Sequence, residues 1–138
     1  MKVTNADLKH TQANIFFIIG PSRSGSTLLQ SMLATHSHIA IPPETHFFKD
    51  IKTYTSIWKK TACKKQFKKL LLSFWEHEQT RMGDLNLPMH RILSLSHRLS
   101  LYSALDIYNL CLTFYRLERG KSIVGEKTPR HMLEVDQI

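Results

Sequence analysis

Residues 15–29 join a buried-strand pattern to a glycine-bounded turn and then to the start of a helix. The run Ile-Phe-Phe-Ile-Ile at 15–19 is apolar, β-branched and aromatic, which is typical of a strand in a parallel sheet that is covered on both faces. A turn rich in hydroxyl groups follows, and the next apolar residues have helical spacing. This order places the amino end of a helix, with its unpaired N–H groups, where an anion binds. The segment therefore predicts a phosphate cradle in an α/β fold.

The turn has the glycine spacing of a nucleotide-binding P-loop but lacks its lysine. Gly20 and Gly25 are separated by four residues, and Ser26 occupies the position of the P-loop lysine. A nucleoside triphosphate needs that lysine, whereas a single 5′-phosphate can be held by backbone N–H groups, hydroxyl groups and one cation. Arg23 can supply the cation. The hydroxyl groups can come from Ser24, Ser26 and Thr27.

Two later segments extend the pattern. Residues 35–48 read Thr-His-Ser-His-Ile-Ala-Ile-Pro-Pro-Glu-Thr-His-Phe-Phe, and residues 125–129 read Gly-Glu-Lys-Thr-Pro. With Gly-Pro-Ser-Arg-Ser-Gly-Ser-Thr-Leu-Leu at 20–29, the chain resembles the sulfotransferases that use 3′-phosphoadenosine 5′-phosphosulfate (PAPS), of the bacterial and tyrosylprotein types. The three segments are similar, in order, to the 5′-phosphosulfate loop, the glutamate segment after the second strand and the third-strand lysine motif. Ser22 and Ser37 stand where the family more often has proline, and neither removes a group that the chemistry needs.

The resemblance implies a role for each candidate site residue. Sulfuryl transfer requires cations and donors on the leaving phosphate and a base on the acceptor. Glu44 is the implied general base, and Lys127 the implied residue that holds the phosphate as it leaves. His46 is a rival base, since an unperturbed histidine pKa of about 6.5 suits neutral pH. Glu126 is expected to orient Lys127, and no metal is implied. The residues implied to bind the cofactor are Arg23, Ser24, Gly25, Ser26 and Thr27.

The leading interpretation is a sulfotransferase that moves the sulfuryl group of PAPS to a hydroxyl or amine of an organic acceptor. The acceptor cannot be read from the sequence, because the helical region 50–118 that would shape its pocket has no signature. One alternative is a non-catalytic nucleotide-binding remnant or interaction module. A small P-loop kinase is a further alternative, which Ser26 in the lysine position disfavours.

The predicted elements place these residues at one edge of a sheet. Strands are expected at 15–19, 39–41 and 122–124, with helices over 54–118 interrupted near 81–88. The leucine alternation at 93–101 also fits a strand locally. Pro42 and Pro43 end the second strand, so Glu44 follows its carboxyl end, the edge where open α/β sheets bind ligands. We expect a P-loop-type parallel sheet flanked by helices.

Three strands are fewer than the five or six of an ordinary sheet, and residues 133–138 read as the start of a further helix. The family's domain also continues past the lysine motif, to an arginine and a serine that hold the 3′-phosphate. We therefore expect a truncated sheet, in which residues 1–138 are the amino-terminal portion of a single sulfotransferase domain and are inactive or incomplete at this length. Residues 1–13 are expected to be a flexible leader.

The formal charge of +8 comes partly from one lysine-rich stretch. Aromatic and leucine residues interleave with these lysines, so the stretch predicts an amphipathic helix with one solvated face. An alternative is a patch that steers an anionic cofactor or acceptor. No nucleic-acid recognition motif accompanies the charge, so no nucleic-acid partner is expected. The lysines are Lys59, Lys60, Lys64, Lys65, Lys68 and Lys69.

The cysteines and the hydropathy of the chain indicate the cellular compartment in which the protein is expected. Cys63 and Cys111 lie far apart and outside any metal-binding spacing, so both are expected to be reduced thiols. No apolar run approaches the roughly 20 residues that cross a bilayer, and the amino terminus lacks the build of a secretory signal. A cytoplasmic protein without a membrane span is expected, and its oligomeric state is not predicted.

Overall fold

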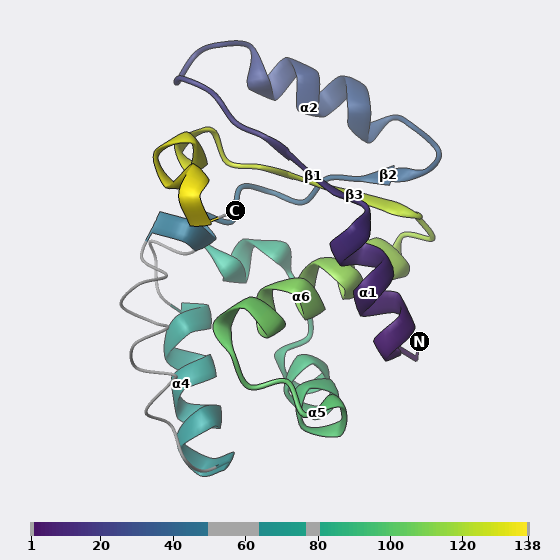
Figure 1. The fold of residues 1–138 in the computed structure, drawn as a ribbon, viewed down its shortest axis with the longest axis vertical. Coiled ribbons are helices and arrows are strands. Elements are labelled where there is room, and N and C mark those ends of the chain that lie inside the picture. The colour runs from purple at the N-terminus through teal and green to yellow at the C-terminus, as the bar shows by residue number, and fades with distance from the viewer. Residues whose placement is uncertain (1, 50–63, 77–80, 138) are drawn as a thin grey trace.

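The computed structural model describes residues 2–49, 64–76 and 81–137. They form an α/β fold in which helices lie on both faces of a three-stranded parallel sheet (Figure 1). The strands are β1 (Ile15–Ile18), β2 (Ile39–Ala40) and β3 (Ile123–Lys127). Strand β3 lies in the middle, in the order β1-β3-β2. The parallel sheet expected from the sequence is confirmed, with strand ends that differ from the expected ones by up to three residues.

The register of the sheet brings the carboxyl ends of the strands together. Ile18 at the end of β1 lies opposite Lys127 at the end of β3. Strand β2 ends earlier, where Ala40 lies opposite Val124, because Pro42 and the proline after it cannot donate to a ladder. The chain after β2 therefore continues toward the same edge without strand pairing.

Helix α2 (Ser26–Ala34) lies alone on one face of the sheet among the described elements (Figure 1). It has no buried residue, and Leu28, Leu29 and Met32 of its apolar side are exposed. Below it, the ring of Phe16 on β1 covers Gly125 of β3, and a Cβ atom at that position would overlap the ring. Glycine thus permits the close approach of an aromatic ring to the central strand.

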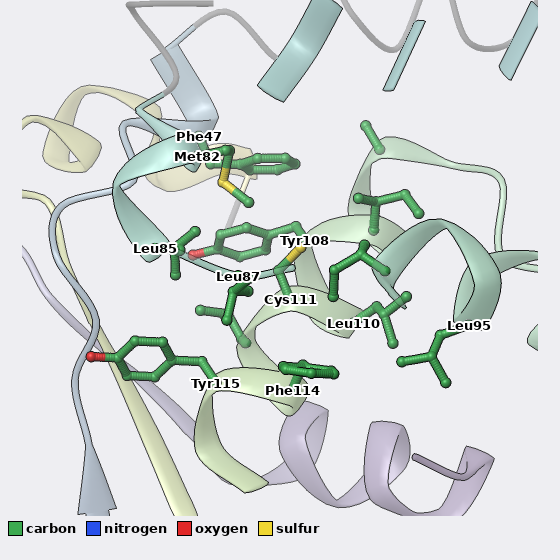
Figure 2. Packing of buried hydrophobic residues seen from close by; sticks show 14 of the residues in the cluster. Phe47, Met82, Leu85, Leu87, Leu95, Tyr108, Leu110, Cys111, Phe114 and Tyr115 are labelled. Atoms are coloured by element: carbon green, nitrogen blue, oxygen red, sulfur yellow. The ribbon is translucent and has the colours of Figure 1, made fainter. Parts of the chain in front are cut away.

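The core lies on the other face, around helix α6 (Ala104–Glu118) (Figure 2). Ser103 and Asp106 form a capping box that begins α6, and ten of its residues are buried. Tyr108 of α6 stacks on Phe47 of the 3₁₀ turn η1 (Phe47–Lys49), with ring centroids 4.1 Å apart. Cys111 is a buried free thiol, and burial raises its pKa.

Four further helical elements follow η1 along the described parts of the chain. They are α4 (Lys64–Glu76), the 3₁₀ turn η2 (Met82–Leu85) and α5 (Met89–Leu99), followed after β3 by the 3₁₀ helix η3 (Pro129–Gln137). Helix α5 resolves the ambiguous leucine pattern in favour of a helix, and η2 lies at the predicted break. None of the helices that the structure describes is long and apolar enough to span a membrane.

Helix α4 confirms part of the predicted amphipathic segment. Phe67, Leu71 and Phe74 are buried, whereas Lys68 and Lys69 are exposed. This arrangement agrees with a solvated basic face. The predictions for Lys59, Lys60 and Cys63 lie outside the described residues.

Helix α1 (Asn5–Ala13) occupies most of the region expected to be a flexible leader. Thr4 and Asp7 form a capping box: the Thr4 N–H donates to Asp7 Oδ2 over 2.9 Å, and the Asp7 N–H donates to Thr4 Oγ1 over 3.3 Å. The expectation missed this signal, because the segment is polar overall and few apolar residues mark its inner face.

Contacts with α6 hold α1 in place. The buried Thr11 hydroxyl accepts from Thr113 Oγ1 over 2.9 Å and from Arg116 Nε over 3.2 Å. Val3 and Leu8 are buried in the core. Helix α1 is therefore packed against the body of the protein.

We predict that Thr4→Ala lowers the free energy of unfolding by about 1 kcal/mol, because the first turn of α1 loses its cap. Urea denaturation measures this change. Thr35→Ala is the matched control, since Thr35 is exposed at the end of α2 and should change the stability by less than about 0.5 kcal/mol. If both variants have the same stability as the parent chain, α1 is not held by its cap.

Candidate functional site

Three chain segments meet at the carboxyl edge of the sheet. They are the loop from β1 to α2, the segment after β2, and the end of β3 with the turn that follows it (Figure 1). The Gly20 N–H donates to the Pro129 carbonyl over 3.4 Å, which joins the first segment to the third. Gln30 Nε2 on α2 donates to the Pro42 carbonyl over 3.1 Å, which joins α2 to the second. The sequence predicted candidate residues on all three segments.

Lys127 connects these segments through its side chain. Its ammonium group donates to Thr27 Oγ1 over 3.2 Å and forms a direct ion pair with Glu44 Oε1. The other Glu44 oxygen, Oε2, lies 3.2 Å from His46 Nε2. The Lys127 side chain is 5% exposed and that of Glu44 28%. A nearly buried cation thus touches a carboxylate that is partly open to solvent.

The imidazole of His46 is a weaker base than that of an ordinary histidine. Burial lowers the pKa of its imidazole below 6.5, and the neighbouring Glu44 carboxylate offsets part of the effect. Because the folded pKa lies below the ordinary value, protonation favours the unfolded chain. The contribution of His46 to stability therefore falls as the pH drops from the ordinary histidine pKa toward the lower folded one.

The loop from β1 to α2 has backbone conformations that are uncommon outside glycine. Arg23 has φ of +64° and Gly25, the N-cap of α2, has φ of +83°. A non-glycine residue in this region costs about 1 to 3 kcal/mol, and such residues cluster at functional sites. His46 also has positive φ, at +50°. Arg81, Asn86 and Ser100, at the ends of η2 and α5, have positive φ as well, so two of the five such non-glycine residues in the described ranges lie on segments that meet at this edge.

The amino end of α2 is open to an anion. No side chain caps it, and its first turn contains no acidic residue. The N–H groups of an uncapped first turn attract anions, and the helix dipole adds about 0.3 to 1 kcal/mol. Arg23, Ser24 and Gly25 are exposed on the loop before it. The Ser24 hydroxyl lies over Gly20, where a Cβ atom would come within 3.3 Å of it.

The structure thus brings Thr27, Glu44 and Lys127 together, with His46 joined through Glu44. Arg23, Ser24, Gly25 and Ser26 lie on the neighbouring loop and the first turn of α2.

Glu126 differs from the expectation that it orients Lys127 directly. It is fully buried, and its Oε1 accepts from Thr45 Oγ1 over 2.8 Å and from Thr128 Oγ1 over 2.6 Å. Its Oε2 lies 3.0 Å from Nδ1 of the buried His131. Burial alone would raise the pKa of Glu126, but the His131 ring and the two threonine hydroxyls outweigh burial, so the pKa is lowered.

The sequence interpretation missed Thr45, Thr128 and His131. One signal was available: successive side chains on a strand point to opposite faces, so neighbours in the Glu126-Lys127 pair cannot share a partner. The identity of the partners also depends on which residues of the segment after β2 face β3. No periodic pattern in the sequence indicates which residues these are.

Comparison with known protein families identifies the family of the chain. A model of the sulfotransferase family matches residues 16–138, and the chain belongs to this family. No curated protein and no solved structure shows a significant match to the chain. Helix α1 precedes the matched residues.

We predict that Glu44→Gln lowers the pKa of His46 further, because the substitution removes the carboxylate that favours the charged imidazole. NMR titration of the His46 ring measures the shift. Glu118→Gln is the matched control, since Glu118 pairs with Arg119 on α6 and should leave the His46 pKa unchanged. An unchanged pKa in Glu44→Gln would contradict the contact between Glu44 and His46.

Proposed function

We propose that this member of the sulfotransferase family transfers the sulfuryl group of PAPS to a hydroxyl or amine of an organic acceptor. The observation that carries the proposal is the chain of contacts from Thr27 through Lys127 to Glu44, which joins the three segments of the family-like pattern. A phosphate at the amino end of α2 would lie beside Thr27. An acceptor at Glu44 would then be on the other side of Lys127.

The loop from β1 to α2 and the first turn of α2 are proposed to bind the 5′-phosphate of the donor. The residue set is Arg23, Ser24, Gly25, Ser26 and Thr27. The uncapped helix end provides N–H donors, and Arg23 provides an exposed guanidinium. Gly20 keeps room for the Ser24 hydroxyl in this cradle. These groups fit one phosphate, and Ser26 in place of a lysine argues against a triphosphate.

The chemical step needs a base and a group that neutralises the leaving phosphate. PAPS supplies an activated sulfuryl group with a phosphate as its leaving group. Glu44 accepts the proton of the acceptor hydroxyl while the acceptor oxygen bonds to sulfur, and the electron pair of the broken S–O bond stays on the phosphate. Lys127 stabilises that phosphate charge. In the contacts described above Lys127 pairs with Glu44, so it exchanges this partner for the phosphate as the reaction proceeds.

Glu44 and His46 remain two candidates for the base. Glu44 is the more exposed of the two and contacts Lys127. His46 has a lowered pKa, so it is neutral at pH 7 and able to accept a proton. Because the two side chains are in contact, the residue not acting as base would orient the other.

We predict that the chain binds 3′,5′-diphosphoadenosine in preference to ATP. Calorimetry measures both affinities, and the bound nucleotide should raise the stability by about 2.7 kcal/mol at 100 times its dissociation constant. Arg23→Ala should weaken binding roughly 10- to 100-fold through loss of a charge-assisted hydrogen bond. Lys9→Ala, on the exposed side of α1, is the control with unchanged affinity. Tighter binding of ATP would favour a P-loop kinase.

We predict that Lys127→Met lowers the rate of sulfuryl transfer by about 10² to 10³, because the leaving phosphate loses its cation. Initial rates with labelled PAPS and simple phenol or amine acceptors measure the effect, with Lys9→Met as control. Glu44→Gln and His46→Gln distinguish the base, since loss of the true base costs about 10² to 10⁴. Because residues 1–138 are expected to be incomplete, the assay uses a form that continues the domain past residue 138, and nucleotide binding without transfer in that form would favour the non-catalytic alternative.

A further inference from the structure

We propose that Thr45, Glu126 and Thr128 are positioning residues, which hold Glu44 in contact with Lys127. The inference rests on the proposed function only in treating Glu44 and Lys127 as the reacting pair. The contacts themselves, and their test, require no reaction.

Two adjacent pairs join the segment after β2 to the end of β3. Glu44 contacts Lys127 at the accessible edge, and the residue after Glu44 and the residue before Lys127 form the buried pair of Thr45 and Glu126. Thr45 and Glu126 are both fully buried. Since only one peptide unit separates the two pairs, the position of Thr45 limits where the Glu44 side chain can begin. The contact between Thr45 and Glu126 thereby limits the geometry of the contact between Glu44 and Lys127.

The buried pair replaces a hydrogen-bond ladder that the sequence interrupts. Strand β2 pairs with β3 only as far as Ala40, and the prolines at 42 and 43 have no N–H to donate. Beyond them, the Thr45 N–H donates to Thr128 Oγ1 over 3.2 Å and to Glu126 Oε1 over 3.4 Å. The His46 N–H also donates to Thr128 Oγ1, over 3.4 Å. Side chains of β3 and its extension thus accept the bonds that a paired strand would have made.

The donors around Glu126 make this attachment stiff. A buried carboxylate without partners is costly, so each donor that it loses destabilises the folded chain. His131 limits the other side of the carboxylate: its Nδ1 lies 3.0 Å from Glu126 Oε2, and its Nε2 accepts from the Phe48 N–H over 3.4 Å. Because Nε2 accepts a hydrogen bond, the ring proton of a neutral His131 is on Nδ1. Segment 45–48 is therefore bound to β3 and to η3 at several points.

A role that is only structural would affect stability without affecting the Glu44 contact. Thr113 provides the comparison, because it is equally buried, and its hydroxyl bonds to Thr11 between α1 and α6, where it contacts no site residue described above. Thr113→Val and Thr128→Val each remove one buried hydroxyl and keep the side-chain shape. Thr128→Ser keeps the hydroxyl and tests rescue.

NMR of the full chain tests the proposal. The readouts are the ¹⁵N signal of the Lys127 ammonium group, which persists while that group is buried and paired, and hydrogen exchange at the Thr45 and His46 amides. Glu44→Gln removes the partner of the ammonium group and should broaden its signal. Thr128→Val should broaden that signal likewise, and should accelerate exchange at both amides by at least about tenfold. Thr128→Ser and Thr113→Val should retain the parent signals.

An ammonium signal and amide exchange like those of the parent in Thr128→Val would overturn the proposal, as would equal changes in Thr113→Val. Thr45→Val serves as the second variant, with the same expectation for the ammonium signal, if Thr128→Val fails to fold. Neither result depends on sulfuryl transfer. The positioning role can therefore fail while the proposed function stands, and the reverse also holds.

Discussion

Parallel pairing of β3 with both β1 and β2 gives three distant chain segments one common edge. The ladder bonds fix the backbone of β3 at Lys127, and Ile18 opposite it fixes the start of the loop from β1 to α2. Catalysis that depends on placing charged groups benefits from such a rigid frame, because the entropy of bringing them together is lost during folding and not during the reaction. The remaining degree of freedom is the segment after β2.

That segment is fixed by polar side chains in place of strand pairing. Pro42 and the proline after it end the ladder, and the hydroxyl of Thr128 and the carboxylate of Glu126 then accept the backbone N–H groups that follow. Since the folded pKa of Glu126 is lowered, its contribution to stability is present above the ordinary glutamate pKa and is lost as the pH falls through the folded value. The same carboxylate therefore connects the stability of the fold with the geometry of the site.

The sequence was informative where local chemistry determines the structure. Apolar β-branched runs identified the strands, paired prolines identified the end of β2, and the glycine-bounded turn identified the loop before α2. Helix α1 was not predicted, because its burial depends on contacts such as that between Thr11 and Thr113, which lie about one hundred residues apart. The partner of Glu126 was also missed, since it depends on how the unpaired segment after β2 faces β3. The alternation of side chains along β3 excludes Lys127 as the partner of Glu126, but it cannot identify Thr45 as that partner.

The ring of Phe16 lies so close to Gly125 that the size of each side chain limits the size of the other. A side chain at position 125 can be accommodated only where position 16 has become small, and an aromatic residue at position 16 requires a bare backbone on β3. In related chains, a larger side chain at position 125 should therefore occur together with a smaller one at position 16. A lineage that altered one without the other would lose the central strand's alignment, and with it the spacing of the glutamate and lysine that follow.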